Sequence, residues 1–226
     1  MPSPRTVRRV AGLLAVALLA ACSDRADDSP LAEGAATDQG ADGSDQPAAG
    51  GEVPDGWQRI TGDGVSLAVP GDWVDVPLDE FDMGAEDLQD ALPEADEAML
   101  EQAASVVQQG GVLLAFGPPG ASGFTDNINV LALPVSAELE ELEQQAELGL
   151  GAVGAELASK EVVEVPSGRA VRVSYSLELD GAEGPYTVRG VQYYVVADGR
   201  TFVLTVSALD APDELADQVA DTFEVA

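Results

Sequence analysis

Residues 169–179 read Arg-Ala-Val-Arg-Val-Ser-Tyr-Ser-Leu-Glu-Leu, and from position 171 onward apolar and polar side chains alternate without a break. The apolar positions are Val171, Val173, Tyr175, Leu177 and Leu179, and the polar ones are Arg172, Ser174, Ser176 and Glu178. Alternation with a period of two is the pattern of a β-strand that has one buried face. The stretch therefore predicts a strand that belongs to a sheet.

Strand and turn signals continue on both sides of this stretch. Residues 162–165 precede it as a short strand, and Pro166-Ser167-Gly168 is predicted to form the connecting turn. Residues 186–197 follow as a long strand, which a hairpin turn at Asp198-Gly199 joins to residues 200–209. The last third of the chain is therefore predicted to be rich in strands.

The first half contributes a hairpin and two further strands. Residues 57–70 are predicted to form the hairpin, with a Gly-rich turn at 61–64. Residues 112–116 and 128–133 are short apolar runs typical of buried strands. A loop rich in Pro and Gly joins them.

Three segments carry helical periodicity. Residues 79–110 are predicted to form a helix in two parts, which Pro93 divides and Gly110 ends. A second helix is predicted with Ser136 as its N-cap, and a third begins at Pro212. Their apolar positions are Leu88, Leu92, Met99, Ala103 and Val106 in the first, Leu139, Leu142, Ala146 and Leu150 in the second, and Leu215, Val219 and Phe223 in the third. Helices between meandering strands predict an α+β fold, a mainly antiparallel sheet covered by helices.

The start of the chain has the composition of a secretory signal peptide. Three arginines, at positions 5, 8 and 9, precede an apolar run at 10–21, which is shorter than the ~20 residues that span a bilayer. Leu19-Ala20-Ala21-Cys22 resembles the lipobox of bacterial lipoproteins, which implies cleavage between Ala21 and Cys22 and acylation of Cys22. We therefore expect export by general secretion and a lipid anchor at the extracytoplasmic face of the cell membrane.

These features predict a chain divided into three segments. Residues 1–21 are the lipoprotein signal peptide, 22–54 the lipidated cysteine with a disordered acidic linker, and 55–226 the folded domain. Past Cys22, the linker has no aromatic residue and no apolar period, so it cannot bury enough apolar surface to fold. Because Cys22 is the single cysteine, the mature domain has neither a disulfide nor a free thiol.

The charge of the chain is strongly negative. Among 226 residues, 10 are Lys or Arg and 41 are Asp or Glu. Removal of residues 1–21, which hold three arginines and no acid, leaves seven basic and 41 acidic residues, a net charge of −34. This charge disfavours nucleic acid and anionic lipid headgroups as partners. It serves either to solubilise the protein or to attract cations and basic partners.

Several kinds of catalytic site are excluded by residue type. The chain has no histidine, so Ser–His–Asp and Cys–His sites and zinc sites built on His or Cys are ruled out. A Ser–Lys dyad would need the single lysine, Lys160, which is predicted to be solvated at the entrance of a strand. Residues 149–154 match G-x-G-x-x-G but follow a helix, whereas a dinucleotide site follows a strand, so they are interpreted as the helix end.

The acidic residues do not identify a site by their spacing. Asp79, Glu80, Asp82, Glu86 and Asp87 offer oxygen ligands for a weak Ca²⁺ site, but they lack EF-hand spacing. Acids also stabilise the N-terminus of a helix, which is the preferred interpretation. No metal and no cofactor are predicted. Carboxylate pairs that would support glycan hydrolysis arise anywhere in so acidic a chain.

Three motifs suggest a family. They are Gly64-Val65-Ser66-Leu67-Ala68-Val69-Pro70-Gly71-Asp72-Trp73, then Asn127-Ile128-Asn129-Val130, and last Gly199-Arg200-Thr201-Phe202-Val203-Leu204-Thr205-Val206. Together with the lipobox, residues 55–226 resemble the LpqN-type lipoproteins of actinobacteria. The resemblance implies a PsbP-like α/β/α sandwich. It also implies a non-enzymatic protein of the cell envelope that binds lipids or partner proteins, and it transfers no site residue.

Aromatic residues are the remaining candidates for a binding site. Trp73, Phe124, Tyr175, Tyr193 and Phe202, together with Tyr194, either line an apolar cleft between sheet and helix or form ordinary core. The leading functional prediction is a non-catalytic envelope module that binds an apolar or lipid ligand or a partner protein. The second is an accessory subunit that docks on an envelope complex without a small ligand. A carboxylate-dependent glycan hydrolase is the remote third.

Overall fold

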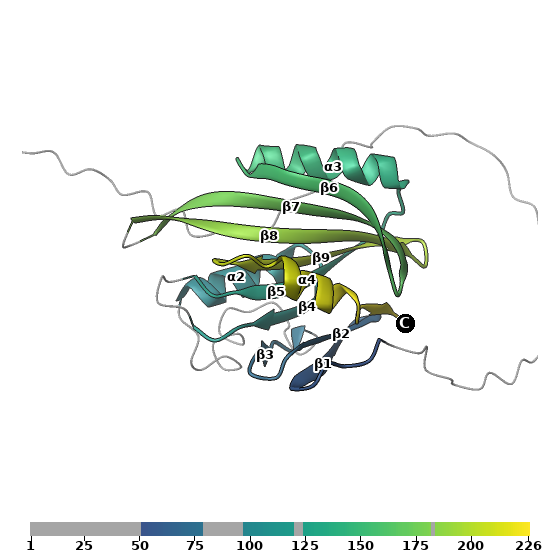
Figure 1. Ribbon diagram of the computed structural model, residues 1–226, viewed down its shortest axis with the longest axis horizontal. Coiled ribbons are helices and arrows are strands. Elements are labelled where there is room, and N and C mark those ends of the chain that lie inside the picture. The colour runs from purple at the N-terminus through teal and green to yellow at the C-terminus, as the bar shows by residue number, and fades with distance from the viewer. Residues whose placement is uncertain (1–50, 79–96, 120–123, 182–183) are drawn as a thin grey trace, which may run out of the picture.

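The computed structural model describes residues 51–78, 97–119, 124–181 and 184–226 (Figure 1). The predicted signal peptide, Cys22, the acidic cluster at 79–87 and the first part of the helix predicted at 79–110 lie outside these residues. Residues 51–54, which their composition assigned to the linker, contact the domain, because Arg59 Nη2 donates to the Gly51 carbonyl oxygen at 2.7 Å. No helix within the described ranges is long and apolar enough to cross a membrane.

The alternating stretch at 169–179 lies in a seven-stranded sheet with the order β3-β4-β5-β9-β8-β7-β6. All neighbouring strands are antiparallel. The bounds are β3 Val74–Asp75, β4 Gly111–Phe116, β5 Asn127–Leu133, β6 Glu156–Val165, β7 Gly168–Gly181, β8 Gly184–Ala197 and β9 Arg200–Ala208. The predicted strands are confirmed, and the one predicted at 162–165 is the end of the longer β6.

Strands β7, β8 and β9 form the meander that the sequence predicts. The β7–β8 register runs from Ala170 opposite Val195 to Gly181 opposite Gly184. Asp198 and Gly199 join β8 to β9 with φ angles of 51° and 72°, the left-handed conformation that a two-residue hairpin turn requires. This turn fixes which residues of β8 and β9 face each other.

The predicted hairpin forms a second, smaller sheet. Strands β1 (Trp57–Gly62) and β2 (Val65–Pro70) pair with each other, and β2 also pairs with the C-terminal strand β10 (Glu224–Val225). The hairpin approaches the main sheet closely at Gly62, where a Cβ atom would lie 1.8 Å from the carbonyl oxygen of Val112. The pairing with the end of the chain is not evident in the sequence.

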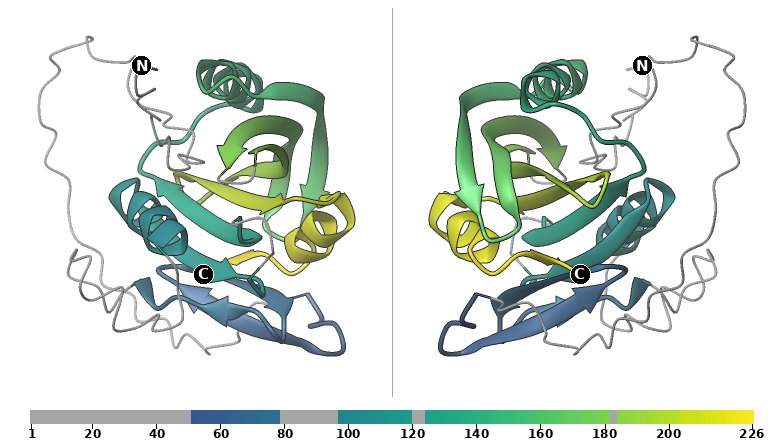
Figure 2. Two further views of the ribbon diagram at one scale, coloured as in Figure 1. Left: turned by 90° about the vertical axis from the view of Figure 1, so that its left-hand side faces the viewer. Right: turned by 90° about the vertical axis from the view of Figure 1, so that its right-hand side faces the viewer.

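Helices cover both faces of the main sheet (Figure 2). Helix α2 (Glu97–Gln108) packs against β4, and α3 (Leu139–Ala152) packs against β6 and β7 on the same face. Helix α4 (Asp213–Ala220) packs on β8 and β9 and on β2, so it shares the opposite face with the small sheet. The predicted fold class, an α+β fold whose mainly antiparallel sheet is covered by helices, is confirmed.

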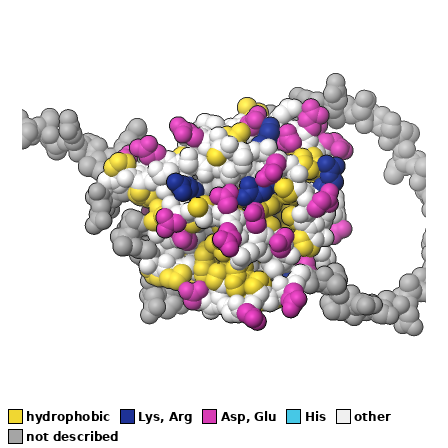
Figure 3. Space-filling model, in the orientation of Figure 1, with side chains coloured by type: hydrophobic (Ala, Val, Ile, Leu, Met, Phe, Trp, Pro, Cys, Tyr) yellow, Lys and Arg dark blue, Asp and Glu magenta, His cyan; other side chains and the backbone are white. Residues whose placement is uncertain are grey.

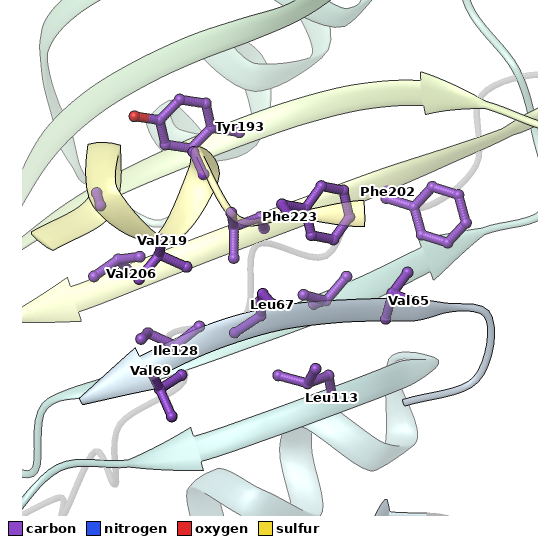
Figure 4. Close-up of a cluster of buried hydrophobic side chains, with 14 of the residues drawn as sticks. Val65, Leu67, Val69, Leu113, Ile128, Tyr193, Phe202, Val206, Val219 and Phe223 are labelled. Atoms are coloured by element: carbon purple, nitrogen blue, oxygen red, sulfur yellow. The ribbon is translucent and has the colours of Figure 1, made fainter. Parts of the chain in front are cut away.

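Each face of the main sheet has its own hydrophobic core. Between the main and small sheets, Leu67, Val69, Phe202 and Phe223 pack together and are at most 1% exposed (Figure 4). Under α2 and α3, the large side chains that are at most 1% exposed are Leu114, Phe116, Leu142, Leu150 and Tyr194. The described residues therefore form two cores, which the main sheet separates.

Two predicted helix limits were wrong. Helix α3 begins at Leu139 with Glu138 as its N-cap and no side-chain cap, so Ser136 does not cap it. Glu140 and Glu141 in its first turn stabilise the positive end of the helix dipole instead. Helix α4 starts as predicted after Pro212 but ends at Ala220, so Phe223 lies beyond it in the core next to the small sheet.

Candidate functional site

A groove of about 290 Å³ lies between strand β6 and helix α4. Strands β6, β7 and β8 form its floor, and α4 forms one wall. Its lining residues are Glu161, Val163, Glu164, Val165, Arg172, Tyr193, Asp217, Ala220 and Asp221. The groove thus combines a short aliphatic surface with a rim of carboxylates around one guanidinium.

The strand register explains how the floor is assembled. Glu161 on β6 lies opposite Arg172 on β7, and Arg172 lies opposite Tyr193 on β8. Residues directly opposite each other in antiparallel strands share a face, so these three side chains form a row across the sheet. On α4, Asp213 and Asp217 are four residues apart and therefore face the same way, towards this row.

Arg172 is the centre of the polar contacts. Its Nε donates to Asp217 Oδ1 at 3.0 Å and to the Tyr193 hydroxyl at 3.1 Å. Its Nη2 donates to Asp213 Oδ1 at 2.8 Å, and its Nη1 reaches Glu161 Oε1 at 3.5 Å. The Tyr193 hydroxyl also donates to Asp217 Oδ1. Arg172 is 8% exposed, although it belongs to the polar half of the alternating stretch.

These contacts fix the charges in the groove. Burial by itself lowers the pKa of Arg172, but hydrogen bonds to Asp213, Tyr193 and Asp217 outweigh it and raise the pKa above its ordinary value. Burial raises the pKa of Tyr193, and its hydrogen bond to Asp217 adds to the rise while Arg172 opposes it. Arg172 is therefore a permanent cation at physiological pH, and Tyr193 is neutral.

The electrostatic balance of the groove is negative. Four of its lining residues are acids and one is an arginine. The guanidinium already contacts Asp217 and Glu161, whereas Asp221 on the rim is exposed. The surroundings have the same sign, because Asp and Glu side chains outnumber Lys and Arg over the face shown in Figure 3. The groove consequently favours a positively charged group.

The structure brings three of the five predicted aromatic residues into one core and leaves the other two apart. Trp73, Tyr193 and Phe202 belong to the core between the two sheets, and Tyr175 lies on the opposite face under the helices. Phe124 packs against Tyr186, with ring centroids 6.2 Å apart. All five are at most 8% exposed, so within the described residues they do not line one cleft. Tyr193 alone reaches the groove, its hydroxyl pointing away from Val206 and Val219 (Figure 4).

Tyr194, the further aromatic considered, lies on the same side of the sheet as Tyr175. The Tyr194 hydroxyl donates to Gln192 Oε1 at 2.8 Å, whereas the buried Tyr175 hydroxyl has no hydrogen-bond partner. Burial raises the pKa of Tyr175 to about 12. Ser207 lies close enough to moderate this rise, although no hydrogen bond of normal geometry joins the two hydroxyls. Both tyrosines therefore pack in the hydrophobic core and do not line the groove.

Other residues considered for catalysis have structural roles. Lys160 lies inside β6 rather than at its entrance, and its Nζ is 2.9 Å from Glu147 and 3.4 Å from Glu143 on α3. Ser159 Oγ instead lies 2.7 Å from Ser174 Oγ. The G-x-G-x-x-G stretch ends α3, as predicted, and Gly154 has a φ of 78°. No group of three possible metal ligands occurs in the described part of the chain.

Sequence reasoning missed the central residue of the groove. Arg172 was placed only on the polar face of its strand, because alternation indicates which residues share a face but not what covers it. A weak signal existed in the final helix, where Asp213 and Asp217 present two acids on one face of a chain poor in cations. No spacing in the sequence links that helix to β7.

No family model matches this chain, and no curated protein matches it in sequence. Similar solved structures include PsbP (CyanoP) from Synechocystis sp. PCC 6803, at 15% identity and a TM-score of 0.42, covering 81% of this chain and 100% of that one. LpqN, involved in cell envelope biogenesis of Mycobacterium tuberculosis, is 15% identical with a TM-score of 0.43, covering 76% and 92%. The Ran-binding protein Mog1p of Saccharomyces cerevisiae is 12% identical with a TM-score of 0.46, covering 75% and 95%. The likeness concerns the fold alone.

Proposed function

We propose that this protein is a non-catalytic binding module of the cell envelope, anchored through Cys22, which docks a positively charged segment of a partner protein in the groove between β6 and α4. The observation that carries the proposal is the charge of the groove, which is lined by four acids and a single guanidinium. Opposite charge across an interface steers encounter and selects the partner.

The guanidinium does not neutralise the whole groove. Each side-chain nitrogen of Arg172 already contacts a neighbouring group. These groups are the Tyr193 hydroxyl and the carboxylates of Glu161 on β6 and of Asp213 and Asp217 on α4. Glu164 has one loose ion pair, with Arg169 at 3.7 Å, in which both side chains are mostly exposed. Asp221, the residue that follows α4, is exposed at the other rim. These two carboxylates are therefore available to a cation from outside.

The aliphatic part of the groove suits the stem of a long basic side chain. Val163, Val165 and Ala220 supply apolar surface beside the carboxylates. Lysine and arginine place their methylene groups on such surface and keep the charged end next to acids or water. A basic protein segment therefore matches both parts of the groove, whereas a lipid tail matches only the apolar part.

The arrangement of the acids argues against the hydrolase alternative. Hydrolysis by paired carboxylates needs two of them to face each other across the bond to be cleaved. Here Glu161, Asp213 and Asp217 are directed at Arg172 instead. Their geometry holds a cation between elements of the fold, and we infer that the site binds rather than catalyses.

The proposal is tested by purifying the protein from membrane extracts and measuring how much partner co-purifies with each of two variants of equal charge. In the first, Glu164→Gln and Asp221→Asn remove the two carboxylates of the groove that do not contact Arg172. In the control, Glu140→Gln and Glu141→Gln remove two exposed acids from α3, far from the groove in sequence. The full-length protein and the control should co-purify the same partner, and the groove variant should retain at least about tenfold less.

The same pair of variants separates specific docking from general acidity. The affinity for pentalysine, measured by isothermal titration calorimetry, should be lower in the groove variant than in the control. Added salt should reduce this affinity in both variants. Equal partner recovery and equal pentalysine affinity in the two variants would exclude the groove as the docking site. Recovery of a lipid in place of a protein would favour the ligand-binding alternative.

A further inference from the structure

We infer that the partner segment binds as an added β-strand on the outer edge of β6, with basic and aliphatic residues in alternation. This inference rests on the proposed function, because it specifies how a cationic segment occupies the same groove. Addition of a strand to an exposed sheet edge is a general mode of peptide recognition, in which the main chain supplies affinity and alternate side chains supply specificity.

Strand β6 has the properties of an open edge. It is the last strand of the seven-stranded sheet, and no strand of the described chain pairs with its outer side. None of its ten residues is buried. An edge strand of this length presents a row of backbone N–H and C=O groups that can pair with another chain.

The groove opens onto this edge. Its lining includes the consecutive residues Val163, Glu164 and Val165. Successive side chains of a strand point to opposite faces of the sheet, so a surface that touches three in a row runs along the edge and not over one face alone. A segment paired with the end of β6 would therefore lie in the groove.

The two sides of β6 predict the side chains of the added strand. On the α4 side, residues of the added strand come next to Glu161 on β6 and the carboxylates of α4, which favour lysine or arginine. On the α3 side, Leu157 and Val162 are 41% and 39% exposed, and their cross-strand partners Tyr175 and Val171 belong to the core on that face. Aliphatic residues would cover this apolar surface.

Charge argues against a second copy of this chain as the occupant. Pairing of two β6 edges would bring Glu156, Glu161 and Glu164 of both copies close together. The one lysine of the strand, Lys160, is already engaged by Glu143 and Glu147 of α3. Like charges directly opposite each other destabilise a strand pair. A basic segment from another protein meets no such repulsion.

Two peptides test the mode of binding with the intact exported domain. The first is acetyl-Lys-Val-Lys-Val-Lys-Val-Lys-amide, and the second is the same peptide N-methylated on its three central residues. The two carry equal charge, but methylation removes hydrogen-bond donors from both edges of the peptide. The first should bind and slow hydrogen exchange at the amides of β6, and the second should bind at least about tenfold more weakly without protecting β6.

The outcomes separate this inference from the proposed function. Equal affinity of the two peptides, with both weakened by Glu164→Gln and Asp221→Asn, would overturn strand addition and retain the acidic docking groove. Binding that protects no β6 amide would overturn strand addition as well. Failure of both peptides to bind, together with unchanged partner recovery in the groove variant, would overturn both. Protection of β6 in concentrated protein without peptide would instead indicate self-pairing.

Discussion

Arg172 Nε lies 3.0 Å from Asp217 Oδ1, and this ion pair joins strand β7 to helix α4. The arginine is almost fully buried, while the side chain of Asp217 is 56% exposed. The same aspartate accepts a hydrogen bond from Tyr193 on β8. The contact thus fixes one wall of the groove relative to its floor, and its loss should affect both stability and binding.

Replacement of Arg172 by Met should destabilise the domain by about 2 kcal/mol, because several charge-assisted hydrogen bonds are lost while the partly solvated acids remain. Urea unfolding measures this change. Arg189→Met, at an exposed arginine of β8, is the matched control and should change stability by less than about 0.5 kcal/mol. An equal effect of the two substitutions would show that the cluster around Arg172 contributes nothing particular to stability.

Replacement of Tyr175 by Phe should leave the domain equally stable or stabilise it by about 1 kcal/mol, because the buried hydroxyl has no hydrogen-bond partner. Tyr193→Phe is the contrasting variant. It removes a hydroxyl that contacts both Arg172 and Asp217, and should cost about 1 kcal/mol. Clear destabilisation by Tyr175→Phe would indicate that this hydroxyl has a partner in solution.

Stability should fall as the pH rises above about 10, the ordinary pKa of tyrosine. Burial raises the pKa of Tyr175 to about 12 and also raises the pKa values of Tyr193 and Tyr194. The folded state therefore holds these protons more tightly than the unfolded state. The resulting stability is fully present below the unfolded pKa and is lost as the pH passes through the folded one. Urea midpoints between pH 9 and pH 12 should fall less steeply in Tyr175→Phe than in the unsubstituted protein, and parallel curves would contradict the prediction.

Replacement of Gly190 by Ala should destabilise the domain by about 2 kcal/mol through overpacking. A Cβ atom at this position on β8 would lie 2.2 Å from the Cζ atom of Tyr175. Gly151→Ala in α3 is the control, because a Cβ atom there meets nothing within 4 Å, and it should stabilise the helix by up to about 1 kcal/mol. The double variant Gly190→Ala with Tyr175→Leu should recover part of the loss, and strict additivity would argue against a clash with this ring.

Replacement of Cys22 by Ala should move the protein out of the membrane fraction or leave its signal peptide uncut, because the thiol that receives the lipid is absent. Cell fractionation and the mass of the mature N-terminus measure both effects. Ser23→Ala is the neighbouring control and should leave anchoring unchanged. A Cys22→Ala protein that remains acylated and membrane-bound would refute the predicted anchor.

Most individual strands were predictable because their signals are local. The alternation at 169–179, the Asp198-Gly199 turn and the apolar runs at 112–116 and 128–133 each correspond to a strand or turn of the structure. The limits were less well determined: β6 begins at Glu156, and α3 begins after Glu138 instead of Ser136. Gly154, with a φ of 78°, marks the turn two residues before β6, whereas no side-chain cap marks the start of α3.

The candidate site was far less predictable. The aromatic residues Tyr175 and Tyr193 were grouped by chemical type, yet they lie on opposite faces of the same sheet. Arg172 was placed on the polar face of its strand, yet it is buried between β7 and α4. A period of two sorts the residues of one strand into two faces but does not state which helix or sheet covers each face.

The sequence by itself determined the α+β class, the strand meander and the absence of chemistry based on histidine, because these depend on local periodicity and on which residue types are present. Only the tertiary structure decided that β10 joins the hairpin, that the sheet has two separate cores, and that Glu161, Arg172, Tyr193 and Asp217 surround one groove. Those four residues come from four elements spread over 57 positions of the chain, from 161 to 217. Their meeting depends on strand register and helix packing, which no local pattern specifies.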